Sequence, residues 1–304
     1  MLNNAFKFNL LKYLIFTIYV ALMFVMGCNT KNDEKILQID LSQKDEKSEL
    51  QKGITDTTKL FVAVSTMISP LETFSLYQDL INYISKKINV QIVFKQRKTY
   101  EEVNKLLEEK KLDFAFICTG AYLQARKEFP IELLAIPVVE GRPYYNAYVI
   151  VNKESKIKSF DELKNKSFAY TDPLSNTGYM YIINLLKEKN QGDKYFSKTI
   201  FTYAHDYSIQ AVSRNLVDGA SVDGLVYEYL KYFQPEKVKN ISIINKSSDF
   251  GIPPFVVQPE MDRVIKEKIK QVMYDMHKDE EGKIILGKIL IDKFIPANDS
   301  LYHQ

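Results

Sequence analysis

The chain has 304 residues, with 41 Lys and Arg against 38 Asp and Glu and a formal net charge of +3. This near balance excludes the basic excess that nucleic-acid-binding proteins usually carry. Hydrophobic residues make up 46%, which is too apolar for a disordered chain, and the length suffices for one large domain or two lobes. With two cysteines, Cys28 and Cys118, and three histidines, at most one disulfide can form and a dense zinc cluster is excluded. We expect neither a metal nor a cofactor.

Residues 1–27 have the pattern of a secretory signal. Lys7 and Lys12 are their only charged residues, and the uncharged run that follows is shorter than the roughly 20 residues of a membrane span. The run ends at Cys28 and resembles a bacterial lipoprotein signal, which implies that Cys28 becomes the first residue of the mature chain and carries a lipid. An uncleaved anchor helix is the alternative. Both interpretations place residues 29–304 outside the cytoplasm, tethered to a membrane.

Residues 28–58 are polar and contain few large apolar side chains. Such a segment cannot bury enough surface to offset the entropy lost on ordering. We interpret it as a flexible linker between the lipid anchor and a folded body.

From residue 59 onward, apolar runs alternate with segments of helical periodicity. The runs predict strands over residues 60–64, 90–94, 113–117, 131–138, 144–153, 167–170, 217–222, 241–244 and 253–257. Helices are expected over residues 74–84, 101–110, 122–128, 205–212, 225–232, 263–276 and 281–291, with another after residue 178. The spacing of Ser159 and Glu162 is typical of a capping box that opens one more helix. This alternation predicts an α/β fold of mainly parallel sheets flanked by helices.

The loop from Asp172 to Gly178 is the most informative segment, because it joins a predicted strand to a predicted helix. A helix N-terminus has unpaired N–H groups and an effective positive charge, so it can bind an anion. Ser175 and Thr177 add hydroxyl groups, Asn176 adds an amide, and Gly178 would let a ligand approach the backbone. The alternative is an ordinary Ser or Thr helix cap without a ligand.

His205 lies at a second predicted strand-to-helix junction, where it could donate a hydrogen bond to an oxyanion. The alternative is a surface cap in which Asp206 is the N-cap residue. A nucleophilic pair of Cys118 and His205 is a third possibility, although no sequence feature brings them together, and Cys118 fits a buried inert thiol better. Tyr100 and Tyr145 lie at the ends of apolar strands, where a tyrosine by itself is more often a core or surface residue than a ligand contact.

Together these segments resemble the periplasmic phosphonate- and phosphite-binding proteins of ABC importers. The resemblance covers about residues 60–290, and its most specific parts are the loop DPLSNTG after SFAY and the pair HD after FTYA, followed by VDG. It implies a type II periplasmic-binding-protein fold, in which two α/β lobes are joined by two crossing strands and the ligand lies in the cleft. Lobe 1 would comprise residues 59–146 plus 256–304, and lobe 2 residues 147–255, with crossings at Tyr144–Val151 and Pro253–Val257.

The resemblance also implies a binding site whose hydrogen-bond donors come from both lobes. Its members would be Tyr100, Tyr145, Ser175, Asn176, Thr177 and His205. The three loop residues would hold the phosphorus oxygens, while segments 65–69 and 119–121 line the wall of lobe 1. Family members commonly carry Ser-Thr-Ser in that loop, and Asn176 replaces a hydroxyl with an amide that still donates.

Two positions bear on the ligand. Leu225 and Pro253 stand where family members that bind aminoalkylphosphonates place carboxylates, and an unpaired buried ammonium would cost several kcal/mol. We therefore expect phosphate, phosphite or a short alkylphosphonate. Asp223 would accept a hydrogen bond from a protonated ligand oxygen and so discriminate against sulfate; its alternative role is a helix N-cap.

The implied function is capture by lobe closure, without any bond made or broken. We expect a monomer that delivers its oxyanion to an ABC permease driven by a separate ATPase. Three alternatives stay open: an enzyme on the same fold that cleaves phosphorus esters with His205, Asp206 and either Cys118 or Ser175; a binding protein of a sensor system; and a binder of a sulfonate or a vitamin precursor.

Overall fold

The computed structural model describes residues 59–192 and 194–303, which fall in one structural unit, Thr55–Gln304. The expected signal peptide 1–27, the lipid-bearing Cys28 and the linker 28–58 lie outside the described residues and stay predictions. Within the described part of the chain, no helix combines the length and the apolar character needed to cross a membrane.

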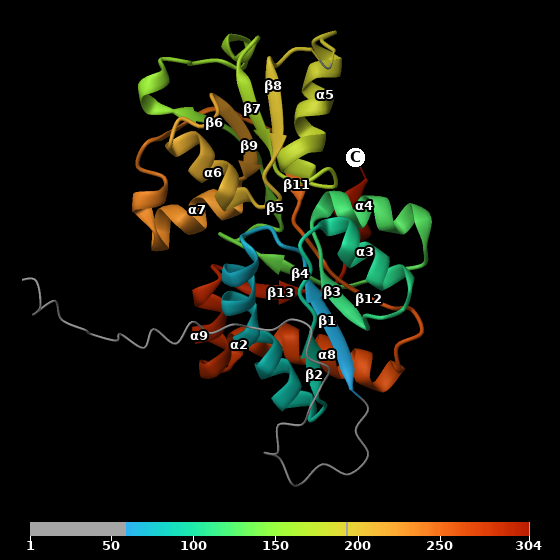
Figure 1. Cartoon of the computed structure of the whole chain (residues 1–304). Coiled ribbons are helices and arrows are strands. Elements are labelled where there is room, and N and C mark those ends of the chain that lie inside the picture. The colour runs from blue at the N-terminus through green and yellow to red at the C-terminus, as the bar shows by residue number, and fades with distance from the viewer. Residues whose placement is uncertain (1–58, 193, 304) are drawn as a thin grey trace, which may run out of the picture. The chain divides into compact units, whose positions relative to one another are not determined.

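The first sheet has six strands in the order β13-β4-β12-β3-β1-β2 (Figure 1). They are β1 (Leu60–Val64), β2 (Ile92–Phe94), β3 (Phe114–Phe116), β4 (Glu132–Val138), β12 (Phe255–Val257) and β13 (Lys293–Ile295). β1 is parallel to β2 and β3, whereas β12 is antiparallel to β3 and β4. All residues of β3 and β12 are buried, because helices cover both faces, and this explains their continuous apolar runs.

The second sheet has five strands in the order β10-β6-β9-β7-β8. They are β6 (Ala147–Asn152), β7 (Ser167–Tyr170), β8 (Lys198–Phe201), β9 (Gly219–Asp223) and β10 (Ile241–Lys246). β7 is parallel to β8 and β9, and β6 is antiparallel to β9 and β10. The sequence did not predict β8, since this edge strand is exposed along its whole length and lacks a buried apolar run.

Helices flank both sheets (Figure 1). The first sheet is accompanied by α2 (Pro70–Ile88), α3 (Tyr100–Glu108), α4 (Thr119–Glu128), α8 (Arg263–Asp275) and α9 (Glu280–Lys288); the second by α5 (Tyr181–Glu188), α6 (His205–Ser213) and α7 (Gly224–Phe233). Helices connect the parallel pairs β1–β2 and β7–β8, because parallel neighbours need a long crossover connection. The predicted α/β class is confirmed.

The chain passes between the two sheets at β5 (Tyr144–Tyr145) and β11 (Phe250–Gly251), which form a separate antiparallel pair (Figure 1). The expected crossing strands lie differently, because β6 belongs entirely to the second sheet and β12 to the first. Asn146 separates β5 from β6, and its side-chain amide donates to the carbonyl oxygens of Ser247 and Ser248, both at 3.0 Å. These bonds tie the two crossing segments together.

The predicted capping box at Ser159 is wrong. The side chain of Ser159 accepts no hydrogen bond from a helix N–H, and only a single 3₁₀ turn, Phe160–Leu163, follows. A capping box does open α3, where Thr99 Oγ1 accepts from the N–H of Glu102 and the Glu102 carboxylate accepts from the N–H of Thr99. This cap fixes the position of Tyr100, the first residue of the helix.

Candidate functional site

The loop between β7 and α5 folds as a capped helical turn. Ser175 Oγ accepts a hydrogen bond from the N–H of Gly178 at 2.9 Å, and a π-helical turn, Asn176–Met180, leads into α5. Because Ser175 Oγ accepts this bond, its own hydroxyl proton can still be donated to another acceptor. The capping role that the sequence left as an alternative is therefore present, and it does not occupy the donor capacity of the side chain.

A glycine is needed at position 178 for a different reason from the approach of a ligand that the sequence suggests. A Cβ atom there would lie 2.5 Å from Thr171 Oγ1 and 3.0 Å from His205 Cε1. The space beside Gly178 is thus filled by protein side chains, and the glycine allows His205 to pack directly against the loop.

His205 is the first residue of α6 and is fully buried. Its Nδ1 accepts a hydrogen bond from the backbone N–H of Asp223 at 3.0 Å. Since a backbone N–H can only donate, Nδ1 must carry the lone pair and Nε2 the proton. Nε2 lies 3.4 Å from Ser175 Oγ. Burial lowers the His205 pKa to about 3, so the ring is a neutral N–H donor at physiological pH.

Five fully buried polar atoms of the site make no hydrogen bond of normal geometry within the described residues. They are Ser65 Oγ, Tyr100 OH, Tyr145 OH, Asn176 Nδ2 and Thr177 Oγ1. The other two such atoms, Asn104 Oδ1 and His277 Nδ1, belong to α3 and to the segment after α8. Buried polar atoms are nearly always paired, so five unpaired ones among the predicted ligand residues and their neighbours mark this place as the candidate binding site.

The tyrosine hydroxyls lie close enough to influence each other. Burial is the main cause that raises the pKa of both Tyr100 and Tyr145 well above its ordinary value, and the nearby Asp223 carboxyl raises both further. Asn176 lies beside the Tyr145 hydroxyl and opposes part of that rise. Both hydroxyls therefore stay protonated, and each can donate a hydrogen bond.

Asp223 ends β9 and is buried. Its Oδ1 accepts from the N–H of Leu225 at 2.7 Å, so it is the N-cap of α7, the alternative that the sequence left open. Burial raises its pKa to about 7, which leaves a large fraction of the carboxyl protonated near neutral pH. The group can therefore donate to or accept from a ligand oxygen, depending on its proton.

Two carboxylates join the two sheets beside these donors. Asp206 Oδ1 accepts from the N–H of Ser69, the N-cap residue of α2, at 2.9 Å, and Asp172 Oδ2 accepts from the N–H of Tyr100 at 3.2 Å. Asp206 is not the N-cap of its own helix, because Ala204 holds that position. Sequence reasoning missed this arrangement, since Asp206 and Ser69 are 137 residues apart.

The geometry does not support a nucleophilic cysteine. Burial raises the pKa of Cys118 to about 12, so the thiol stays protonated. Within the described residues, no hydrogen bond joins Cys118 to His205; the backbone N–H groups of Asn176 and Gly120 approach the sulfur instead.

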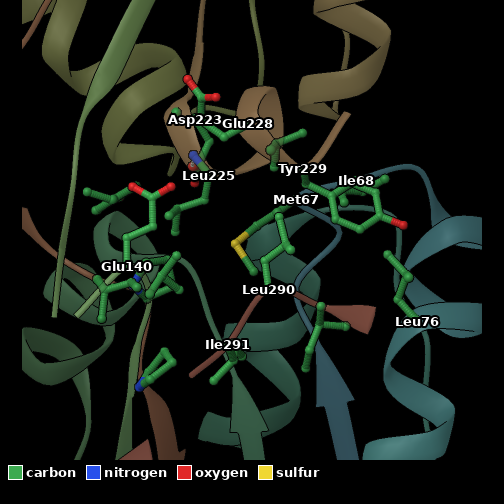
Figure 2. Close-up of a pocket in the computed structure, with 18 of the residues that line it drawn as sticks. Met67, Ile68, Leu76, Glu140, Asp223, Leu225, Glu228, Tyr229, Leu290 and Ile291 are labelled. Atoms are coloured by element: carbon green, nitrogen blue, oxygen red, sulfur yellow. Dashed lines mark hydrogen bonds between the residues drawn. The ribbon is translucent and has the colours of Figure 1, made fainter. Parts of the chain in front are cut away.

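A cavity of about 850 Å³ adjoins the donors. Ser65, Tyr145 and Asp223 are among its lining residues, together with many apolar side chains. Figure 2 shows Met67 and Leu225 projecting from facing sides of this cavity, with Asp223 at one end. Of the five unpaired donors, Ser65 and Tyr145 line this cavity, whereas Tyr100, Asn176 and Thr177 do not.

Comparisons with known proteins bear on the fold and the family of the chain. A curated relative, the phosphonates-binding periplasmic protein of Escherichia coli (strain K12), is 25% identical over 221 residues, which cover 71% of this chain but only 65% of that relative. The crystal structure of a binding protein component of an ABC phosphonate transporter from Pseudomonas aeruginosa is 24% identical, with a TM-score of 0.76 over 81% of this chain and 84% of that chain.

PhnD1 from Prochlorococcus marinus (MIT 9301), solved in complex with methylphosphonate, is 19% identical, with a TM-score of 0.75 over 81% of this chain and 94% of that chain. These likenesses confirm the predicted type II periplasmic-binding-protein fold. Residues 62–302, most of the chain, match a single protein family. The chain therefore belongs to the family of periplasmic substrate-binding proteins of phosphonate ABC transporters.

Proposed function

We propose that this protein is an extracytoplasmic solute-binding lipoprotein of an ABC importer, which captures a small phosphorus oxyanion by closing two lobes around it. The ligand would be phosphate, phosphite or a short alkylphosphonate. The closed protein would dock, as a monomer, on a membrane permease that a separate ATPase drives. Residues 59–146 plus 256–304 would form lobe 1 and residues 147–255 lobe 2.

The buried set of unpaired donors carries the proposal. Leaving a buried polar group without a partner costs about 1–3 kcal/mol. The hydroxyls of Ser65, Tyr100, Tyr145 and Thr177 and the amide of Asn176 would each regain a hydrogen bond from a tetrahedral oxyanion between them. The Nε2–H of His205 and the free hydroxyl proton of Ser175 would complete the shell. Neutral donors fixed before binding can hold an anion without a countercharge.

The proposed site favours an amine-free ligand over an aminoalkylphosphonate. Leu225 and Pro253 line the cavity next to the donors and offer no carboxylate. Asp223 is half neutral near pH 7 and already caps α7, so it is a poor partner for an ammonium group. It is better suited to a protonated oxygen of the ligand, which sulfate lacks at this pH.

Calorimetric titration tests this function directly. The purified full chain should bind methylphosphonate, phosphite or phosphate at micromolar concentration, equivalent to about −8 kcal/mol, and 2-aminoethylphosphonate more weakly. Tenfold tighter binding of the amine would show that Leu225 and Pro253 have been misinterpreted. A failure of all four compounds, with sulfate as the control anion, would contradict the proposed function.

A further inference from the structure

We infer that this protein takes phosphonates whose organic substituent is apolar and larger than methyl, with the substituent in the cavity beside the donors. The inference rests on the proposed function and extends its ligand class from short to larger apolar substituents. It starts from a mismatch of size: a methyl group is comparable to one water, roughly 30 Å³, whereas the cavity measures about 850 Å³. A methylphosphonate would leave almost all of this volume to solvent.

The cavity adjoins two of the unpaired donors. Ser65 and Tyr145 line it, and their hydroxyls are two of the five unpaired buried atoms. In Figure 2 the carboxyl group of Asp223 points away from Met67 and Leu290, so the polar boundary lies at one end of the cavity. A phosphorus group held by the donors would therefore direct its fourth substituent among the apolar side chains.

The surfaces that such a substituent would meet are apolar. Met67 and Phe116 of the first-sheet side, Leu225 of α7, and Ile252 and Pro253 beside β11 all line the cavity. Apolar walls with a few convergent polar groups at one end are the usual design of a small-molecule site, and the volume falls within the common range. An aliphatic or aromatic group would gain binding energy in proportion to the area it removes from water.

The charged residues that line the cavity do not favour a charged substituent over an apolar one. Glu228 pairs with Lys231 at 2.9 Å, and Arg142 pairs with Asp249 at 3.0 Å, so these charges are already compensated. Glu140 and Asp292 also line the cavity and are exposed to solvent. An amine at the far end of a chain would have to compete with water for either carboxylate, and such a partner is worth little at an exposed position.

The test compares methyl-, butyl-, phenyl- and 4-aminobutylphosphonate by calorimetry, with the full chain held in phosphatidylcholine nanodiscs. Each fully buried methylene raises affinity about fourfold. Since the cavity is open to solvent on one side, we expect butyl- and phenylphosphonate to bind at least tenfold more tightly than methylphosphonate. Binding of methylphosphonate without this gain would overturn the inference and leave the proposed function standing. Tighter binding of 4-aminobutylphosphonate than of the butyl compound would also overturn it.

A variant pair locates the effect. Leu225→Gln puts an amide into the cavity wall and should reduce the butyl-to-methyl affinity ratio at least threefold. Leu216→Gln, the same change at a leucine that is 71% exposed, should leave the ratio as it is. An unchanged ratio in Leu225→Gln would remove the cavity from the site. If none of the four compounds binds the unaltered chain, the proposed function fails, and the inference fails with it.

Discussion

The hydrogen bond between Asp206 and Ser69 offers the sharpest test of capture by closure. Asp206 lies on the second-sheet side and accepts from the N–H of Ser69 at the start of α2, on the first-sheet side. Neither residue is among the proposed ligand donors. The bond exists only while the two sides are together, so Asp206→Ala should weaken ligand binding without removing any ligand contact.

The structure sets the size of this effect. A hydrogen bond to a charged group contributes about 1.5–3 kcal/mol. Burial raises the pKa of Asp206, which shows that its charged form loses hydration and that part of the gain is offset. The lower end of the range is therefore appropriate, and about 1.4 kcal/mol corresponds to a tenfold weaker affinity. In an open protein both groups would be hydrated, so losing this hydrogen bond destabilises the closed state and not the open one.

Asp218→Ala is the matched control. Asp218 accepts from the N–H of Ser167 at 2.8 Å, but both residues belong to the second sheet and its loops. This variant should lower the free energy of unfolding by a similar amount and leave the affinity for methylphosphonate unchanged. Titration calorimetry and chemical denaturation of both variants give the comparison. An affinity within twofold of the unaltered protein in Asp206→Ala would refute the closure mechanism as we describe it.

Three further predictions concern single groups. Thr177→Val removes an unpaired buried hydroxyl without changing shape, so it should raise the melting temperature of the ligand-free protein while weakening methylphosphonate binding at least tenfold by calorimetry; a lower melting temperature with intact binding would contradict its donor role. The folded-state pKa of Asp223, about 7, lies above its unfolded value, so the folded state holds the extra proton and the free energy of unfolding should fall as pH rises from about 4 to 7. Chemical denaturation at pH 5 and 8 checks this. If the free energy of unfolding falls equally in Asp223→Asn, the pH dependence arises from another group. Cys28→Ser should abolish fatty-acid labelling and release the protein from membranes on fractionation, whereas persistent membrane attachment would favour an uncleaved anchor helix.

The sequence determined the fold class and the local elements with long apolar runs. β1, β7 and α8 are recognisable because burial on both faces of a strand, or on one face of a helix, selects side chains with a period that the sequence displays. It failed at β8, whose exposed residues carry no such period, and at Ser159, whose hydroxyl bonds the Glu162 carboxylate instead of a helix N–H.

The ligand residues are predicted from motifs that resemble those of the family, and not from hydrophobic periodicity. Only the tertiary structure shows that Nδ1 of His205 accepts from Asp223, which leaves the proton on Nε2, and that Asp206 reaches Ser69. These contacts join segments far apart in the chain, and no local propensity encodes them. Ser65 likewise becomes notable only when its hydroxyl is seen buried and unpaired, because such a condition depends on every neighbour that folding brings near.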